Sequence, residues 1–197
     1  MILIRYNTHI TCGLFIGMLS LSPFLNYIIL NFNILELSIL LIFYFYFLNL
    51  GSIFPDIDCP QSYIGKKFPF ISKLINTKFH HRGFTHSILF IYFLVLLSFL
   101  INIVFKISYP YIFVLINNYI LMIYYGFILG CISHILFDMF NSNGVCLLYP
   151  SNQKYRLPLA PVIKVNSKSE KALNSFLSFL TDILIIIYIF YYIKFFT

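Results

Sequence analysis

The stretch from Tyr111 to Phe140, YIFVLINNYILMIYYGFILGCISHILFDMF, decides the fold class of this chain. It is mostly apolar over more than the ~20 residues that a helix needs to cross the hydrocarbon core of a bilayer. Its last two turns carry His134 and Asp138, and we expect these turns to project beyond the lipid or to line a cavity in the protein. The stretch therefore predicts a membrane-spanning helix that ends in polar side chains.

The composition of the whole chain is that of a membrane protein. Hydrophobic residues make up 60% of its 197 residues and charged residues 10%, and the mean hydropathy is +0.90. These values lie outside the range of soluble globular proteins. The net charge of +7 does not require nucleic acid as a partner, because basic residues in cytoplasmic loops orient a membrane protein. We expect one membrane-embedded domain over residues 1–197, with no nucleic acid and no obligate protein partner.

Four further apolar runs are long enough to act as spans. We therefore predict an all-α, polytopic helical membrane protein with about five transmembrane helices, at residues 11–30, 34–50, 87–105, 111–140 and 176–196. The first run continues for more than ~18 residues and has no small-residue cleavage site, so we interpret it as a retained helix and not as a signal peptide. A short amphipathic helix is expected near residues 68–79, lying at the membrane interface.

Two polar, basic loops separate the runs, one from about Gly51 to Thr85 and one from Asn141 to about Asn174. If the N-terminus is cytoplasmic, Arg5 and the basic residues of both loops face the cytoplasm, and only Lys106 and Lys194 face outside. This distribution agrees with the positive-inside rule, which the opposite orientation would violate. We therefore predict a multi-pass protein with a cytoplasmic N-terminus and two cytoplasmic loops.

The same topology brings dispersed ionisable residues to one membrane face. Four of the five histidines and three of the six acidic residues fall there, namely His9, Asp56, Asp58, His81, His86, His134 and Asp138. Such groups are costly beside lipid, so they indicate a functional site. Imidazole nitrogens and carboxylate oxygens are also the donors that divalent cations take. The four cysteines form no C-x-x-C pair and predict no thiolate site.

Two short motifs carry the aspartates. His134 and Asp138 are four residues apart on a helix, so their side chains share a face. Asp56 and Asp58 flank an isoleucine and would point the same way in an extended segment. Aligned carboxylates repel each other unless a proton or a cation lies between them. Each motif alone is also common in solvated structural roles, so it is the set that predicts a metal site.

The stretch HRGFTHS, from His81 to Ser87, is the most specific motif of the chain. We expect His86 to be a metal ligand and His81 to be a ligand or a general acid/base. Arg82 would hold an anionic substrate oxygen or pair with a carboxylate. Either Thr85 or Ser87 would cap the third span.

The expected metal ligands are more numerous than the three or four protein ligands of one catalytic zinc. They are His9, Asp56, Asp58, His86, His134 and Asp138. Either two ions share the site, or some donors orient the others. A metal site of this kind favours hydrolysis of an ester or phosphoester, and at a membrane face the expected substrate is a lipid or a lipid-linked molecule.

Two other functions remain open. A divalent-cation transporter would need ionisable groups near the bilayer midplane, where these spans are almost bare. A membrane scaffold with a structural metal would have every coordination position filled by the protein.

Six motifs together resemble the YdjM-like family of bacterial inner-membrane proteins, a family described as predicted membrane-bound metal-dependent hydrolases. They are PDID, SYIGKK (62–67), HRGFTHS, GCISHILFD (130–138), GVCLLYP (144–150) and RLP (156–158). The resemblance runs from His9 to about Lys171 and leaves the last span unconstrained. Asn141 stands where the family more often has threonine.

The resemblance implies a location in the inner membrane and one or two divalent ions, zinc by preference. By motif match the ligand positions are those given above, together with His81. A more distant likeness to zinc-dependent phospholipase C and related nucleases implies phosphoester cleavage.

Overall fold

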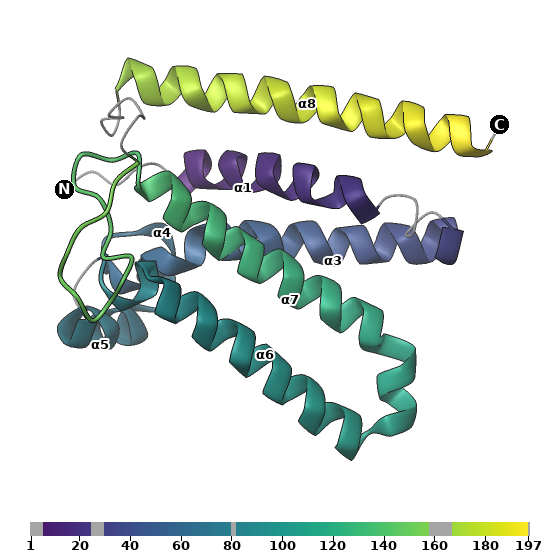
Figure 1. Ribbon diagram of the computed structural model, residues 1–197, viewed down its shortest axis with the longest axis horizontal. Helices are drawn as coiled ribbons and strands as arrows, with labels where there is room; N and C mark the ends of the chain where they lie inside the picture. Colours follow the sequence, from purple (N-terminus) through teal and green to yellow (C-terminus); the bar gives the residue numbers. More distant parts are fainter. Residues whose placement is uncertain (1–5, 25–29, 80–81, 158–166, 197) are drawn as a thin grey trace.

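The computed structural model describes residues 6–24, 30–79, 82–157 and 167–196 (Figure 1). Over these residues the chain is all-α and contains no strand, only an isolated bridge between Val145 and Tyr155. The α-helices are α1 (Tyr6–Leu21), α3 (Ile34–Ile53), α4 (Tyr63–Lys67), α5 (Pro69–Phe79), α6 (Ile88–Ser108), α7 (Pro110–Asp138) and α8 (Lys168–Phe196). Short 3-10 turns are η1 (Ser22–Phe24), η2 (Phe54–Asp58) and η3 (Phe84–His86).

Four segments of the described chain are long and apolar enough to cross a membrane: Ile34–Asp58, Ile88–Ser108, Pro110–Asp138 and Lys168–Lys194. They confirm the prediction of an all-α polytopic membrane protein.

The first and last helices differ from the sequence expectation in their bounds. Helix α1 begins at Tyr6 and ends at Leu21 instead of running from 11 to 30. Pro23, in η1, lacks a backbone donor and disfavours helix in the residue before it, which explains the early end. Residues 25–29 lie outside the described part. Helix α8 begins at Lys168, ahead of the expected residue 176.

Helices α3 and α7 form the centre of the bundle, and α1 packs against both. Their backbones touch at glycines: a Cβ on Gly130 would lie 2.3 Å from the carbonyl oxygen of Leu48, and one on Gly51 would lie 2.1 Å from that of Phe127. Small residues allow membrane helices to approach this closely. His134, one turn after Gly130, is thereby held against the end of α3.

Helices α6 and α8 flank this centre, with α6 against α7 and α8 against α1 (Figure 1). Only 6% of the apolar window of α6 and 11% of that of α8 is buried inside the protein, against 33% for α3 and for α7. Their exposed residues are apolar, such as Phe93, Val104 and Phe190. A chain embedded in a membrane turns these faces to lipid.

One end of the bundle carries α4, α5 and the loop that follows α7 (Figure 1). The amphipathic helix expected near 68–79 is α5, and its Asn76 side chain donates a hydrogen bond to the carbonyl oxygen of Asp58 (2.7 Å). Ser87 caps α6 by accepting from the backbone N–H of Phe90. These contacts fix η2 and η3 at the end of the bundle where the ionisable residues lie.

Candidate metal centre

Three histidines from three elements meet at this end. His9 comes from the first turns of α1, His86 from η3 and His134 from the last turns of α7. The Nε2 atoms of His86 and His134 are 3.2 Å apart, and the rings of His9 and His134 are stacked with centroids 3.9 Å apart. All three residues are buried.

Two carboxylates approach the same nitrogens. Asp56 Oδ1, from η2, lies 3.7 Å from His86 Nε2 and 3.6 Å from His134 Nε2. Asp138 is one turn beyond His134, and its Oδ2 lies 3.4 Å from His86 Nε2 while its Oδ1 lies 3.8 Å from His9 Nε2. The potential ligand atoms of His9, His134 and Asp138 lie within 4.8 Å of one another, as do those of Asp56, His86 and His134. Either group could hold a metal ion.

The outer nitrogens of two of the imidazoles have protein partners. His134 Nδ1 lies 2.7 Å from the carbonyl oxygen of Ser52, which can only accept, so Nδ1 carries the proton and Nε2 the lone pair. His86 Nδ1 lies 3.2 Å from Asp58 Oδ2 and 3.0 Å from the Thr85 hydroxyl oxygen. The same Asp58 oxygen accepts hydrogen bonds from the Thr85 hydroxyl (2.6 Å) and the Arg82 backbone N–H (3.0 Å). Asp58 thus faces the outer edge of His86.

Arg82 holds Asp138. Its Nε lies 3.0 Å from Asp138 Oδ2, and a terminal nitrogen donates to Oδ1 at 3.2 Å. The arginine has φ +64°, a left-handed conformation that costs a non-glycine residue ~1–2 kcal/mol. Both of its backbone groups are bonded, the N–H to Asp58 and the carbonyl to the N–H of Cys146 (3.2 Å). The backbone is therefore locked in the conformation that directs the guanidinium to Asp138.

The surroundings of His86 favour its charged form. Burial alone would lower the pKa of His86, but the charge of Asp58 and hydrogen bonds with Asp138, Asp56 and Asp58 raise it well above the usual value. A cation at the same place would be stabilised by the same carboxylates.

The side chains of the centre differ in exposure. Those of Asp56 and Arg82 are 12% and 16% exposed, whereas those of His9, His86, His134 and Asp138 are 3% exposed or less. Of these side chains, Asp56 and Arg82 are therefore the most accessible to a small molecule.

The structure brings together seven of the eight residues singled out in the sequence. His81 lies outside the described residues, so nothing is concluded about its position. Asp58 differs from the other acids, because it faces the outer nitrogen of His86 and belongs to neither group of potential ligands. Arg82 has the second of its two expected roles, since it pairs with a carboxylate.

Three further residues, which sequence reasoning did not place at the centre, contact its side chains, and a fourth lines a pocket together with His9. Ser52 contributes only a backbone carbonyl, which no side-chain pattern reveals. Thr85 bonds Asp58, while Ser87, the other residue considered as a cap, caps α6. Asn141 donates to Asp138 Oδ1 at 2.9 Å. Glu170, the fourth, is a buried acid in the first turn of α8 and accepts a hydrogen bond from Thr8 (3.1 Å).

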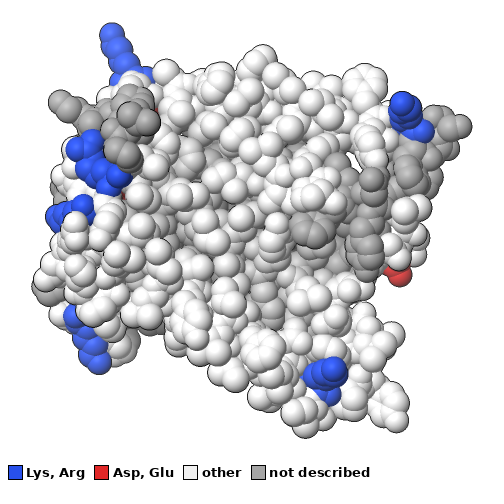
Figure 2. Space-filling view, in the orientation of Figure 1, with Lys and Arg blue, Asp and Glu red and all other residues white. Residues whose placement is uncertain are grey.

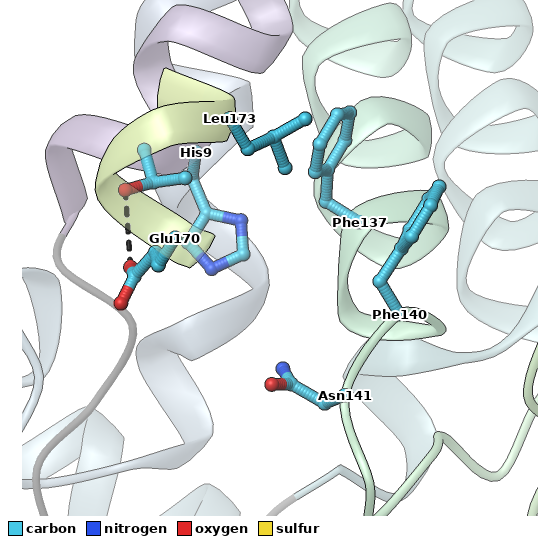
Figure 3. Close-up of a pocket in the computed structure, with 7 residues that line it drawn as sticks. His9, Phe137, Phe140, Asn141, Glu170 and Leu173 are labelled. Carbon is cyan, nitrogen blue, oxygen red and sulfur yellow. Dashed lines mark hydrogen bonds between the residues drawn. The ribbon is translucent and has the colours of Figure 1, made fainter. Parts of the chain in front are cut away.

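A small pocket adjoins His9 (Figure 3). It lies between α1, α8 and the end of α7, and is lined by Thr8, His9, Phe137, Phe140, Asn141, Glu170 and Leu173. About 10 Å³ is open to the centre of a water molecule, which is room for one water.

Comparison with known proteins places the chain in a family. The family model for the YdjM inner membrane protein matches residues 4–194. The chain belongs to the YdjM inner membrane protein family. The match covers every described residue of the centre and extends through most of α8, the helix that the sequence motifs had left unconstrained.

Two curated relatives have clear sequence similarity. The uncharacterized protein YvsG of Bacillus subtilis (strain 168) is 38% identical over 123 residues, which are 61% of this chain and 64% of YvsG. The inner membrane protein YdjM of Escherichia coli (strain K12) is 39% identical over 110 residues, 56% of this chain and 50% of that protein. The matched part thus spans less than two thirds of either relative. No solved structure matches the chain.

Proposed function

We propose that this chain is a metal-dependent hydrolase of the inner membrane, which cleaves a phosphoester or another ester bond of a lipid or lipid-linked substrate at the cytoplasmic face. Zinc is the proposed metal, because imidazole nitrogen and carboxylate oxygen at a buried site are its usual ligands.

The facing Nε2 atoms of His86 and His134 carry the metal part of the proposal. Nδ1 of His134 donates to a carbonyl and Nδ1 of His86 faces a carboxylate, so the Nε2 atoms of the two rings face each other across 3.2 Å. Carboxylate oxygens of Asp56 and Asp138 lie 3.4–3.7 Å from the same nitrogens. The lone pairs of the two nitrogens and the negative charges of the two carboxylates repel one another unless a proton or a cation lies among them.

His134 belongs to both groups of potential ligands, and its Nε2 has one lone pair. We therefore propose a single zinc ion bound by His134, with further ligands from His9, His86, Asp56 and Asp138. Asp58 would orient His86 through its outer nitrogen and would not contact the ion, as carboxylates commonly do behind metal-bound histidines.

Zinc at this centre would supply a Lewis acid that activates water near neutral pH and stabilises charge on an ester oxygen. Residues of the protein itself would bind and orient the substrate. Asp138 occupies two nitrogens of Arg82, so the remaining N–H donors of its guanidinium can bind an anionic oxygen of a substrate that arrives at the exposed side. His81, adjacent to Arg82 in sequence, is proposed as the general acid/base.

The surface around the centre supports a lipid substrate and a cytoplasmic location. Lysines and arginines gather at the end of the bundle that carries α4 and α5 (Figure 2), as the positive-inside rule requires of a cytoplasmic end. On α5, Phe70 is 82% exposed beside the exposed Lys73 and Lys78. A helix with apolar and basic side chains at this level suits a membrane interface with anionic lipids.

Purified protein tests the proposal. The zinc content per chain is measured first, and hydrolysis of a generic phosphoester and of phospholipids is then assayed with added zinc. Asp138→Asn and His134→Gln are expected to lose both zinc and turnover. Asp182→Asn is the matched control, since Asp182 is exposed on α8 and belongs to neither group of potential ligands.

Each outcome has a distinct meaning. A wild-type chain that takes up no zinc refutes the metal centre. Bound zinc without turnover of any ester refutes the hydrolase and favours a structural metal. Zinc transport into proteoliposomes that is abolished by Asp138→Asn favours a transporter.

A further inference from the structure

The three histidines of the centre all direct Nε2 inward, but they differ in the partner of their outer nitrogen, Nδ1. Each directs Nε2 to the centre, where His9 Nε2 lies 3.8 Å from Asp138. The outer nitrogens of His134 and His86 face the Ser52 carbonyl and the Asp58 carboxylate. The outer nitrogen of His9 is buried and makes no hydrogen bond within the described residues. A buried N–H without an acceptor costs ~1–3 kcal/mol, so this nitrogen calls for a partner.

The pocket beside His9 contains a suitable acceptor. Glu170 lies in its wall, is 3% exposed, and comes from the first turn of α8 (Figure 3). The Thr8 hydroxyl donates to Glu170 Oε1 and fixes the carboxylate beside the neighbouring residue, His9. The room for one water next to the imidazole lets a single molecule join the two groups.

We propose that Glu170 is a positioning residue for the metal centre: its carboxylate accepts, through one water in this pocket, the hydrogen bond that His9 Nδ1–H donates. The inference rests on the proposed metal function. It gives His9 the kind of outer partner that the other two histidines have, and a carboxylate in this role fixes the tautomer and makes the imidazole a stronger ligand. It also assigns α8 a part in the site.

A purely structural role for Glu170 is the alternative. In that case the acid would only tie α8 to α1 through Thr8, and the state of His9 would not matter. The two roles predict different behaviour in variants that change the Thr8 bond and the His9 ring separately.

The test measures zinc affinity of the full chain in detergent, by competition with a chromogenic chelator. Glu170→Gln is nearly isosteric but loses the charge, and is expected to weaken zinc binding ~10–100-fold. Glu36→Gln is the matched control, because Glu36 caps the opposite end of α3 and glutamine is accepted in that capping position. Thr8→Val removes the bond to α1 but leaves the charged carboxylate in the pocket wall, so zinc binding should weaken much less than in Glu170→Gln.

A double-mutant cycle with His9→Gln completes the test. If Glu170 acts through His9, Glu170→Gln has no further effect on zinc affinity once His9 is replaced. The inference is overturned if Glu170→Gln binds zinc as tightly as wild type, if Thr8→Val weakens binding as much as Glu170→Gln, or if the effect persists without His9. A wild-type protein that binds no zinc instead refutes the proposed function, and the inference with it.

Discussion

Replacing Gly130 with alanine is expected to separate α3 from α7 and to weaken metal binding at a distance. The new Cβ would lie 2.3 Å from the carbonyl oxygen of Leu48 and 2.7 Å from the backbone nitrogen of Ser52. Carbon and oxygen atoms approach to ~3.3 Å without repulsion. Because both neighbours are backbone atoms, the helices must move apart by ~1 Å to relieve the contact.

The magnitude follows from the bond that this contact supports. His134, one turn beyond Gly130 on α7, has its Nδ1 2.7 Å from the Ser52 carbonyl oxygen on α3. Moving the two helices apart by ~1 Å takes this pair past the ~3.2 Å limit of a good hydrogen bond. Loss of such an orienting bond lowers metal affinity ~10–100-fold. The forced contact itself is expected to cost ~1–3 kcal/mol of stability.

Zinc competition and thermal unfolding in detergent measure both effects. Gly17→Ala is the control, because its Cβ would meet the end of the flexible Leu48 side chain, at 2.3 Å. We expect both the zinc affinity and the Tm to fall in Gly130→Ala and to change little in Gly17→Ala. Wild-type affinity and Tm in Gly130→Ala would show that the two backbones are not in contact and that this contact does not position His134.

Three further variants or conditions test other contacts. Asp58→Asn should reduce zinc affinity ~10–100-fold by removing the negative charge beside the outer nitrogen of His86, and a zinc affinity equal to that of the wild type would contradict the orienting role. Since the carboxylates around His86 raise its pKa and favour the charged ring, whereas zinc binds the neutral ring, zinc binding should release a proton and tighten as pH rises. Calorimetry in two buffers of different ionisation enthalpy should then give different heats, and equal heats would rule out the release. Arg82→Lys keeps the charge but loses the paired contact with Asp138, so denaturant titration should show a loss of ~1–3 kcal/mol, and unchanged stability would show that this contact adds nothing.

The membrane helices could be predicted because hydropathy and length report them directly. The span predicted at residues 111–140 is α7, which runs from Pro110 to Asp138. Because successive spans cross the membrane in opposite directions, the predicted topology also brought the end of this span to the face where η2 and η3 lie. The bounds of α1 were missed because the apolar run continues past Pro23, where backbone sterics end the helix. Hydropathy measures apolar character alone and does not report that break.

The arrangement inside the centre could be predicted only in part. Spacing and topology indicated which histidines and aspartates meet, but not which atom of each faces inward. Asp56 and Asp58 were expected to point the same way from an extended segment, and instead a 3-10 turn directs Asp58 to the outer edge of His86. Glu170 was missed because a lone acid at the start of a helix is an ordinary feature of sequences. Its proximity to His9 comes from packing of α8 on α1, which no local pattern encodes.

The centre draws its side chains from α1, η2, η3 and α7, which come from widely separated parts of the chain. During synthesis, therefore, the set is incomplete until α7, the second-last helix of the described chain, has been made. Zinc capture would then be a late event that reports correct association of the helices in the bilayer. Under the proposed function, a misassembled copy would lack this ion and would differ in metal content from a mature molecule.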